Sequence, residues 1–239
     1  MISCIVPARN EEGHLRAVLN QVMQVNEISQ ILIVEGGSTD DTLKEANQLA
    51  KENSKLIQVI QQSGSGKFDA VRQASELCNM SLIIIWDADG TVPLSSVKNL
   101  VSSALNSGNA TIGDRLSGKI EKGAMRKANY LGNWLFAILW APIMQGKVVD
   151  LLCGTKIFTK EVYASIPNRV ARHDPYGDFS LLLSARICGQ KVESVPVHYL
   201  KRQYGATNIK RWSGGLKLIK VTLLSYSFFW KIKKNQIHG

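Results

Sequence analysis

Four short apolar runs, each followed by a polar loop, divide the first half of the chain. They are rich in β-branched residues and have the length of strands that a parallel sheet buries on both faces. The runs occupy residues 3–7, 31–34, 56–60 and 82–86. Apolar residues at helical spacing follow the first three runs, over residues 15–22, 43–49 and 69–78. This repeated strand–loop–helix order predicts a mainly parallel, doubly wound α/β sheet flanked by helices.

Polar residues in the loops indicate where the helices begin. Asn10 is expected to cap the first helix, with acidic residues in its first turn. Residues 38–41 offer caps for the second helix. Gly90 and Pro93 end the fourth strand, so the residues between that strand and Pro93 lie in a turn at its carboxyl end.

Two carboxylates, Asp87 and Asp89, follow the fourth apolar run with only Ala88 between them. Open α/β sheets bind ligands at the carboxyl ends of their strands, which is where this pair is expected. Two acids so close repel each other unless a cation lies beside them, and hard oxygen ligands favour Mg²⁺ or Mn²⁺. Such an ion would hold a diphosphate. The alternative is an acidic surface turn without function.

The loops after the other predicted strands are also suited to a nucleotide. Residues 63–67 form a glycine-rich loop that ends in the cation Lys67. Backbone N–H groups and a lysine can hold phosphate oxygens, and carboxylates can hold ribose hydroxyls. The loop has neither the P-loop spacing nor G-x-G-x-x-G, which disfavours kinase and dinucleotide-binding functions.

Charge is unevenly distributed along the 239 residues, whose length fits one domain with a C-terminal extension. The net charge is +10, and from residue 201 onward there are nine Lys or Arg and no Asp or Glu. A basic tail indicates anionic lipid, phosphorylated substrates or nucleic acid, or else a solvated basic face. No nucleic-acid-binding module is recognisable, so nucleic acid is not an expected partner.

The cysteines and the apolar stretches bear on location. None of the four cysteines lies in a C-x-x-C spacing, which is typical of core residues in a reducing compartment. The sequence starts at once with a strand pattern, so we expect no signal peptide. We expect no spanning helix, because no stretch reaches ~18 uninterrupted apolar residues. The predicted location is cytoplasmic, with peripheral attachment to the inner face of the cell membrane.

Four ordered motifs in the first ~115 residues resemble those of GT-A glycosyltransferases of family 2. They are PARNEE at 7–12, VEGGSTDDT at 34–42, QSGSGKFDA at 62–70 and DADG at 87–90. The resemblance implies a Rossmann-like GT-A fold and a nucleoside-diphosphate sugar donor. It implies a set of residues that line the base and ribose: Pro7, Ala8, Asn10, Glu12 and Glu35.

The same resemblance assigns the remaining donor contacts. Asp87 would contact the ribose or sugar, Asp89 the metal and diphosphate, and Lys67 the base or diphosphate. Gly36 departs from the family pattern, which usually has a second Asp there, so the base is left open.

The second half is similar to the polyprenyl-phosphate sugar transferase branch of that family. GDR at 113–115, Arg126, DLLCGTK at 150–156, Asp178, and Arg202 with Gly205 and Thr207 carry this resemblance. It implies a phosphate clamp formed by Arg115, Arg126 and Arg202. It implies sugar contacts from Asp150, Gly154 and Lys156, and places Asp87, Asp89, Asp178 and Arg202 in the catalytic site.

We divide the chain accordingly into a catalytic domain, 1–212, and a basic amphipathic C-terminal helix, 213–239. The nucleotide-binding half spans 1–115 and the acceptor half 116–212. Residues 131–144 and 216–230 are apolar and flanked by Trp and Lys, which is typical of helices at a membrane interface. The alternative is ordinary core or a homodimer surface.

The predicted reaction is inverting, metal-dependent sugar transfer to a polyprenyl phosphate or a cell-surface glycan precursor. A phosphate acceptor is already ionised and needs no base, whereas a hydroxyl acceptor needs one, for which Asp178 is the candidate and Asp174 the second. His173 and His198 are further candidate metal ligands. The alternatives are a nucleotidyltransferase and a non-catalytic nucleotide-sugar-binding protein.

Overall fold

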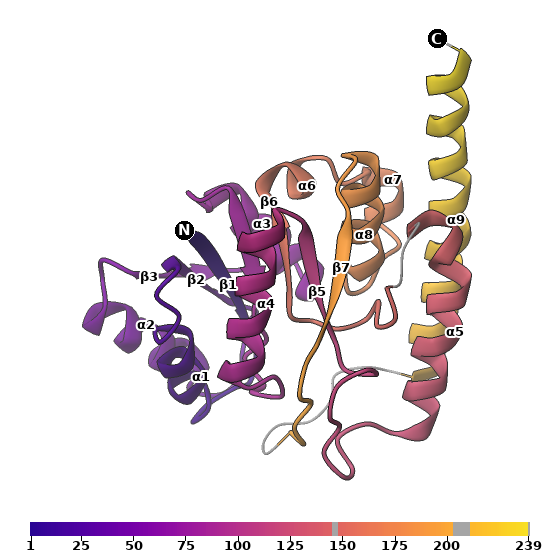
Figure 1. The fold of residues 1–239 in the computed structure, drawn as a ribbon. Helices are drawn as coiled ribbons and strands as arrows, with labels where there is room; N and C mark the ends of the chain where they lie inside the picture. The colour runs from indigo at the N-terminus through magenta and orange to yellow at the C-terminus, as the bar shows by residue number, and fades with distance from the viewer. Residues whose placement is uncertain (145–147, 203–210, 239) are drawn as a thin grey trace.

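The structure, a computed structural model of the chain, describes residues 1–144, 148–202 and 211–238 (Figure 1). Seven strands form one sheet in the order β3-β2-β1-β4-β6-β5-β7. The strands are β1 (Ile2–Ala8), β2 (Ile28–Glu35), β3 (Ile57–Gln61), β4 (Leu82–Ile85), β5 (Ala110–Asp114), β6 (Lys156–Thr159) and β7 (Val192–Pro196). The helices are α1 (Leu15–Val22), α2 (Thr42–Glu52), α3 (Lys67–Leu77), α4 (Leu94–Ser107), α5 (Lys127–Met144), α6 (Lys160–Ala164), α7 (Asn168–Ala171), α8 (Asp178–Ile187) and α9 (Arg211–His238).

The sheet is mainly parallel, as predicted, with one exception. β1 pairs in parallel with both β2 and β4, and β5 pairs in parallel with β7. β6 lies between β4 and β5 and runs antiparallel to both. Its first residue, Lys156, therefore stands opposite Ile85, the last residue of β4. An antiparallel strand thus begins at the edge where the parallel strands end.

Both faces of the sheet are covered, which explains the unbroken apolar strands. Along β1 the buried residues alternate between two cores, so that Ile5 joins one and Cys4 and Val6 join the other. The first core includes residues of α3, α5, α8 and α9, and the second includes residues of α1, α2 and α4. A strand buried on both sides needs apolar residues at every position.

The predicted cap of the first helix is wrong. The residue before α1 is His14, no acid occupies the first turn, and Asn10 lies in the left-handed region with a φ of 56°. The carboxylate of Glu45, on α2, instead accepts hydrogen bonds from the backbone N–H groups of Gly13 and Arg16, at 2.9 Å each. The free N–H groups near the start of a helix need acceptors, and here a neighbouring helix supplies them.

α5 and α9 pack against each other along the right side of Figure 1. The indole N–H of Trp140 donates to Thr222 Oγ1 at 3.0 Å, and the Tyr226 hydroxyl donates to the carbonyl oxygen of Leu139. Within the described part of the chain, no helix combines the length and apolar character needed to cross a bilayer.

Candidate functional site

The loops after the parallel strands meet at one edge of the sheet. The Gly36 N–H donates to the Ala8 carbonyl, and the Gln62 N–H donates to the Glu35 carbonyl, both at 2.9 Å. The Trp86 N–H donates to the Ile5 carbonyl at 3.0 Å, which fixes the start of the loop that carries the acid pair. The edge predicted from the strand–loop order is therefore present.

Asp87 forms an ion pair with Lys67, the first residue of α3. A side chain at Gly154 would overlap Asp87 Oδ2, and its Cβ would lie 2.7 Å from Lys67 Nζ. Gly154 therefore packs directly against this pair. The structure brings Asp87, Lys67 and Gly154 together from three separate segments, because β6 runs antiparallel and the residues before it reach this edge.

Asp89 is held from both sides. Its Oδ1 accepts hydrogen bonds from the Thr91 N–H at 3.1 Å and from the Thr91 hydroxyl at 2.9 Å, and its Oδ2 accepts one from Arg202 at 2.8 Å. The Leu200 N–H donates to the Thr91 carbonyl, which joins the segment after β7 to this loop. Burial raises the pKa of Asp89, but the hydrogen bond and charge of Arg202 outweigh it and lower the pKa below its ordinary value.

Glu11 belongs to the same cluster, and the sequence analysis missed it. Burial is the largest cause that raises its pKa to about 7, and the charges of Asp89 and Asp87 add to this while Arg202 opposes it. Its Oε2 is buried and has no hydrogen-bond partner among the described residues. Glu12, which was predicted to line the donor site, is exposed and accepts a hydrogen bond from the Asp41 N–H at 3.3 Å. The P-x-x-N-E spacing counted from Pro7 ends at Glu11, so the motif itself indicates Glu11 rather than Glu12.

Lys156 and Asp178 form a buried ion pair beside the first two clusters. The Lys156 side chain is fully buried, and that of Asp178 is 10% exposed. The charge of Asp178 also favours the protonated form of Lys67 and so links the pair to the Asp87 cluster. Asp178 begins α8, where its charge favours the helix N-terminus.

The carboxylate of Asp174, the second candidate base, is engaged in hydrogen bonds with backbone N–H groups at the start of α8. Its carboxylate accepts hydrogen bonds from the N–H groups of Gly177 at 2.9 Å and Ser180 at 2.8 Å. Burial is the first cause that raises its pKa, and the charge of Asp178 adds to it. A side chain at Gly177 would overlap the ring of Phe68, so this loop also packs tightly on α3.

The three arginines of the predicted phosphate clamp lie in different surroundings. Arg115 binds Asp150 through two nitrogens, at 2.5 and 2.8 Å, and lies 5.1 Å from the centre of the Tyr199 ring. The Asp150 side chain is fully buried. Arg202 reaches Asp89, whereas Arg126, just before α5, is exposed. The guanidinium of Arg115 is therefore paired with Asp150, and among the three arginines Arg202 is the one that contacts the acid pair.

The residues predicted to line the base and ribose hold the first two loops together. Asn10 Oδ1 accepts a hydrogen bond from the Thr39 N–H at 2.9 Å, and buried Glu35 accepts one from the Ser38 N–H at 2.5 Å. Pro7 and Ala8 end β1, where Ala8 stands opposite Glu35. These side chains lie at the predicted edge, and their polar atoms already bridge neighbouring loops.

The histidines and part of one motif lie outside this cluster. His173 is exposed, and His198 is partly exposed and donates its backbone N–H to Ser96 Oγ at 2.9 Å. Gly205 and Thr207 lie outside the described residues. Across the described ranges no three His, Cys, Asp or Glu side chains gather as a ready-made metal site.

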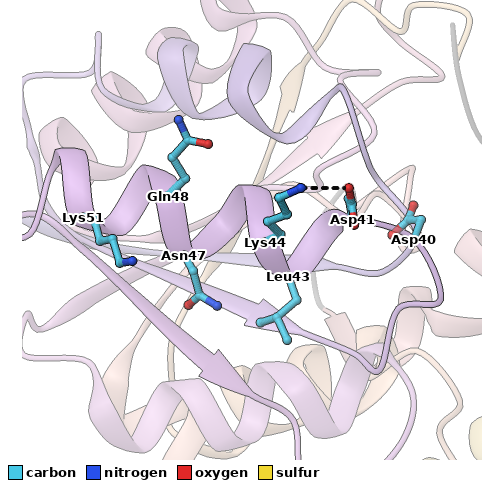
Figure 2. Close-up of a pocket in the computed structure, with 7 residues that line it drawn as sticks. All are labelled: Asp40, Asp41, Leu43, Lys44, Asn47, Gln48 and Lys51. Atoms are coloured by element: carbon cyan, nitrogen blue, oxygen red, sulfur yellow. Dashed lines mark hydrogen bonds and ion pairs between the residues drawn. The ribbon is translucent and has the colours of Figure 1, made fainter.

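A groove of about 600 Å³ on the outer side of α2 is a separate feature (Figure 2). It is lined by the exposed flank of α2 and the loop before it. The lining residues are Asp40, Asp41, Leu43, Lys44, Asn47, Gln48 and Lys51. None of the predicted site residues lines it, and it is open to solvent.

The acid cluster fits a divalent cation in its chemistry. Asp89 and Asp87 offer hard carboxylate oxygens, which Mg²⁺ and Mn²⁺ prefer. The buried Oε2 of Glu11 has no hydrogen-bond partner among the described residues, which fits a group that a bound ion or ligand completes. With few protein ligands available, most of the coordination sphere would come from a phosphate ligand and water.

Comparison with known families and relatives supports the fold and the type of activity. The family model described as Glycosyl transferase family 2 matches residues 3–166. The glycosyltransferase AglJ of Haloferax volcanii is 28% identical over 211 residues, covering 87% of this chain and 66% of that protein. The dolichyl-phosphate beta-glucosyltransferase ALG5A of Trichomonas vaginalis is 26% identical over 251 residues, covering 97% of this chain and 76% of that protein. This chain thus spans just under two thirds of the first relative.

A solved structure has the same architecture. Glucosyl-3-phosphoglycerate synthase from Mycobacterium tuberculosis, in complex with Mn²⁺, uridine diphosphate and phosphoglyceric acid, superposes with a TM-score of 0.70. The two sequences are 18% identical, and the match covers 94% of this chain and 78% of that one. The GT-A fold expected from the sequence is confirmed.

Proposed function

The chain belongs to glycosyl transferase family 2, and from this premise we propose that it moves a sugar from a nucleoside-diphosphate donor to a polyprenyl phosphate. The transfer inverts the anomeric configuration and depends on a divalent cation. The observation that carries the proposal is the meeting of Lys67, Asp87, Asp89 and Arg202 at the carboxyl edge of the sheet. In this proposal residues 1–115 bind the nucleotide, 116–212 the acceptor, and 213–239 form a helix beyond the catalytic domain.

The donor occupies the edge formed by the first four loops. Base and ribose lie against Pro7, Ala8 and Glu35, with Asn10 and Glu12 in the same loops. Lys67 and Arg202 lie beside the acid pair and supply positive charge to the departing diphosphate. Charge that develops in a preorganised, partly buried site is stabilised more strongly than in water.

A divalent cation fits at Asp89, with Asp87 and Glu11 near it. When bound, Mg²⁺ or Mn²⁺ neutralises charge on the diphosphate as it leaves. The chain's own residues hold the two acids apart: Lys67 pairs with Asp87, and Arg202 pairs with Asp89. In the donor complex Arg202 would turn from Asp89 to a phosphate oxygen, because both are anions within its reach.

The environment of Asp178 favours a phosphate acceptor over a hydroxyl acceptor. Its carboxylate is paired with the buried ammonium of Lys156, and a base must release such a partner to take a proton. A phosphate oxygen is already ionised, so it attacks the anomeric carbon directly while the bond from that carbon to the diphosphate breaks. Arg126, exposed just before α5, and Arg202 are the arginines available to position the phosphate. The relative named as a dolichyl-phosphate beta-glucosyltransferase agrees with this acceptor class.

The test is transfer from a panel of nucleoside-diphosphate sugars to a short-chain polyprenyl phosphate, with and without Mn²⁺ or Mg²⁺. Product lipid is identified by mass spectrometry, and anomeric configuration by NMR. Asp89→Ala is expected to lower the rate at least 100-fold, whereas Glu27→Ala, which removes an exposed acid just before β2, should retain it. Release of sugar 1-phosphate instead of nucleoside diphosphate would contradict sugar transfer and indicate nucleotidyl transfer, because the bond broken would then lie between the two phosphorus atoms.

A second arm distinguishes the acceptor classes. Asp178→Asn should retain measurable transfer to a lipid phosphate and should abolish transfer to a sugar hydroxyl, because only the latter needs a base. Binding of donor without turnover on any acceptor would favour a non-catalytic protein.

A further inference from the structure

The outer side of α5 carries an exposed apolar row. Of the large apolar side chains that the structure describes as exposed, only Met1, Leu77 and Leu105 lie outside α5 and α9. Those on α5 recur after three or four residues, so they share one side of the helix. They are Tyr130, Leu131, Trp134, Leu135, Ile138 and Leu139.

α9 carries a second row. Leu216, Ile219, Leu223 and Trp230 are exposed and lie three, four and seven residues apart, which again places them on one side. Leu223 is 67% exposed and Leu216 71%. A single exposed leucine is ordinary, but a row of exposed apolar side chains is not.

The two rows adjoin and form one surface, which we name the α5/α9 face. Trp140, on the inner side of α5, donates to Thr222, which is buried on α9. Tyr226 donates to the Leu139 carbonyl, and Leu139 is the edge residue of the α5 row. The seam between the helices is therefore fixed by contacts, and a partner that binds this face does not have to order it first.

The charged side chains on these two helices are all positive. Neither α5 nor α9 contains an Asp or Glu. Four lysines on α9 have exposed side chains: Lys217, Lys220, Lys231 and Lys234. A second copy docked face to face would bring these cations together around an apolar interface, and like charges across an interface are costly. Anionic lipid head groups would instead complement them.

We propose that the α5/α9 face docks on an anionic lipid bilayer, with both helices lying along the surface and their apolar rows in the interfacial layer. Trp134 and Trp230 suit this depth, because indole rings favour the boundary between head groups and acyl chains. The lysines beside them contact the head groups. Neither helix crosses the bilayer in this arrangement.

This docking face lies one helix away from the acceptor side of the site. Phe179 follows Asp178 at the start of α8, and its ring packs on Phe136 and Trp140 from the inner side of α5, with centroids 5.4 and 4.7 Å apart. A bilayer against the outer side of α5 therefore lies close to the residues that would receive a lipid-linked phosphate. The link to a lipid-linked acceptor rests on the proposed function. Docking of the α5/α9 face on a bilayer does not, because it requires no sugar transfer.

The test is flotation of the full chain with vesicles of phosphatidylcholine alone or with 30% phosphatidylglycerol, at low and high salt. We expect binding to the anionic vesicles and a blue shift of tryptophan emission. The triple variant Leu131→Gln/Trp134→Gln/Leu135→Gln should bind roughly tenfold or more weakly. Leu77→Gln/Leu105→Gln, which removes exposed apolar side chains elsewhere, should bind as the original chain does.

The lysines are tested in the same way. Lys217→Gln/Lys220→Gln/Lys231→Gln/Lys234→Gln should lose about fivefold in binding for each lysine near the surface and should lose the salt dependence. Lys44→Gln/Lys51→Gln is the matched control on α2. Equal binding to neutral and anionic vesicles, or equal binding by the triple variant and its control, overturns the proposal. The proposal is also overturned if light scattering shows that the original chain is a dimer and that the triple variant is a monomer, because the α5/α9 face would then bind a second copy.

Failure of this inference is distinguishable from failure of the proposed function. The triple variant should transfer sugar to a short-chain, water-soluble polyprenyl phosphate at the original rate. It should lose transfer only to the long-chain acceptor in vesicles. Vesicle binding without any transfer would reject the function and keep the docking face, whereas transfer without vesicle binding would reject the docking face alone.

Discussion

Replacing Lys156 with methionine tests whether the Lys156–Asp178 pair is a true buried ion pair. The Lys156 side chain is fully buried and that of Asp178 is 10% exposed, so the variant would leave a nearly buried carboxylate without its ion-pair partner. The ammonium of Lys67 is close enough to act on Asp178, but it is already paired with Asp87. Loss of one partner of a buried pair costs about 3–5 kcal/mol. At about 2–4 °C per kcal/mol for a protein of this size, the melting temperature should fall by roughly 6–20 °C.

Lys44→Met is the matched control. Lys44 pairs with Asp41 at 3.4 Å, but their side chains are 79% and 64% exposed. An exposed pair contributes about 0–1 kcal/mol, so this variant should unfold nearly as the original chain does. Urea unfolding followed by circular dichroism measures both variants under the same conditions.

The double variant Lys156→Met/Asp178→Asn separates loss of the pair from the cost of an uncompensated charge. With the carboxylate also removed, it should recover at least 1 kcal/mol relative to Lys156→Met. A loss below about 1 kcal/mol for Lys156→Met, equal to that of Lys44→Met, would refute the reasoning. It would mean that Asp178 finds water or another cation when Lys156 is absent.

Three further changes probe the acid cluster. Gly154→Ala should lower kcat at least tenfold, because the new Cβ would displace Asp87. Circular dichroism serves as the control that the fold is unchanged. Full activity in a correctly folded variant would contradict the close packing at this glycine. Arg202→Gln should tighten Mn²⁺ binding to the donor-free protein about fivefold, measured by calorimetry, because the guanidinium no longer competes for Asp89; weaker binding would contradict that competition. Glu11 has a pKa raised to about 7, so the native state holds its proton between about pH 4.5 and 7 while the unfolded state has released it. The free energy of unfolding of the original chain should therefore fall as pH rises through that window. Glu11→Gln should be more stable than the original chain by about 1 kcal/mol at pH 8, a value reduced for partial exposure, and equally stable at pH 4. Unfolding curves of both proteins at the two pH values test this.

The parallel part of the fold could be predicted from the sequence because its signals are local. Unbroken apolar runs, glycine-bearing loops and helical spacing each report on a few neighbouring residues. The antiparallel β6 was not predicted, since the direction of a strand in a sheet depends on its distant neighbours. The cap of α1 failed for the same reason, because Glu45 approaches from another helix.

The candidate site was predictable only in part. Asp87, Asp89 and Lys67 follow directly from the loops that carry them. The partnership of Arg202 with Asp89 joins residues 113 positions apart and leaves no local pattern. Glu11 was passed over in favour of its neighbour, although the motif spacing marks it. The roles given to the site residues, and the division of the chain at 115 and 212, stay predictions.

The reversed direction of β6 has a consequence for how such a chain can diversify. Parallel strands present their chemistry after the strand, so a change in a following loop also moves the next helix. β6 presents Gly154 and Lys156 at or before its own start, with its pairing to β4 fixed from Lys156 onward. The segment that leads into β6 can therefore change in length or sequence during evolution and reshape the surroundings of Asp87 and Lys67, while strand pairing and the loops after the parallel strands keep their places.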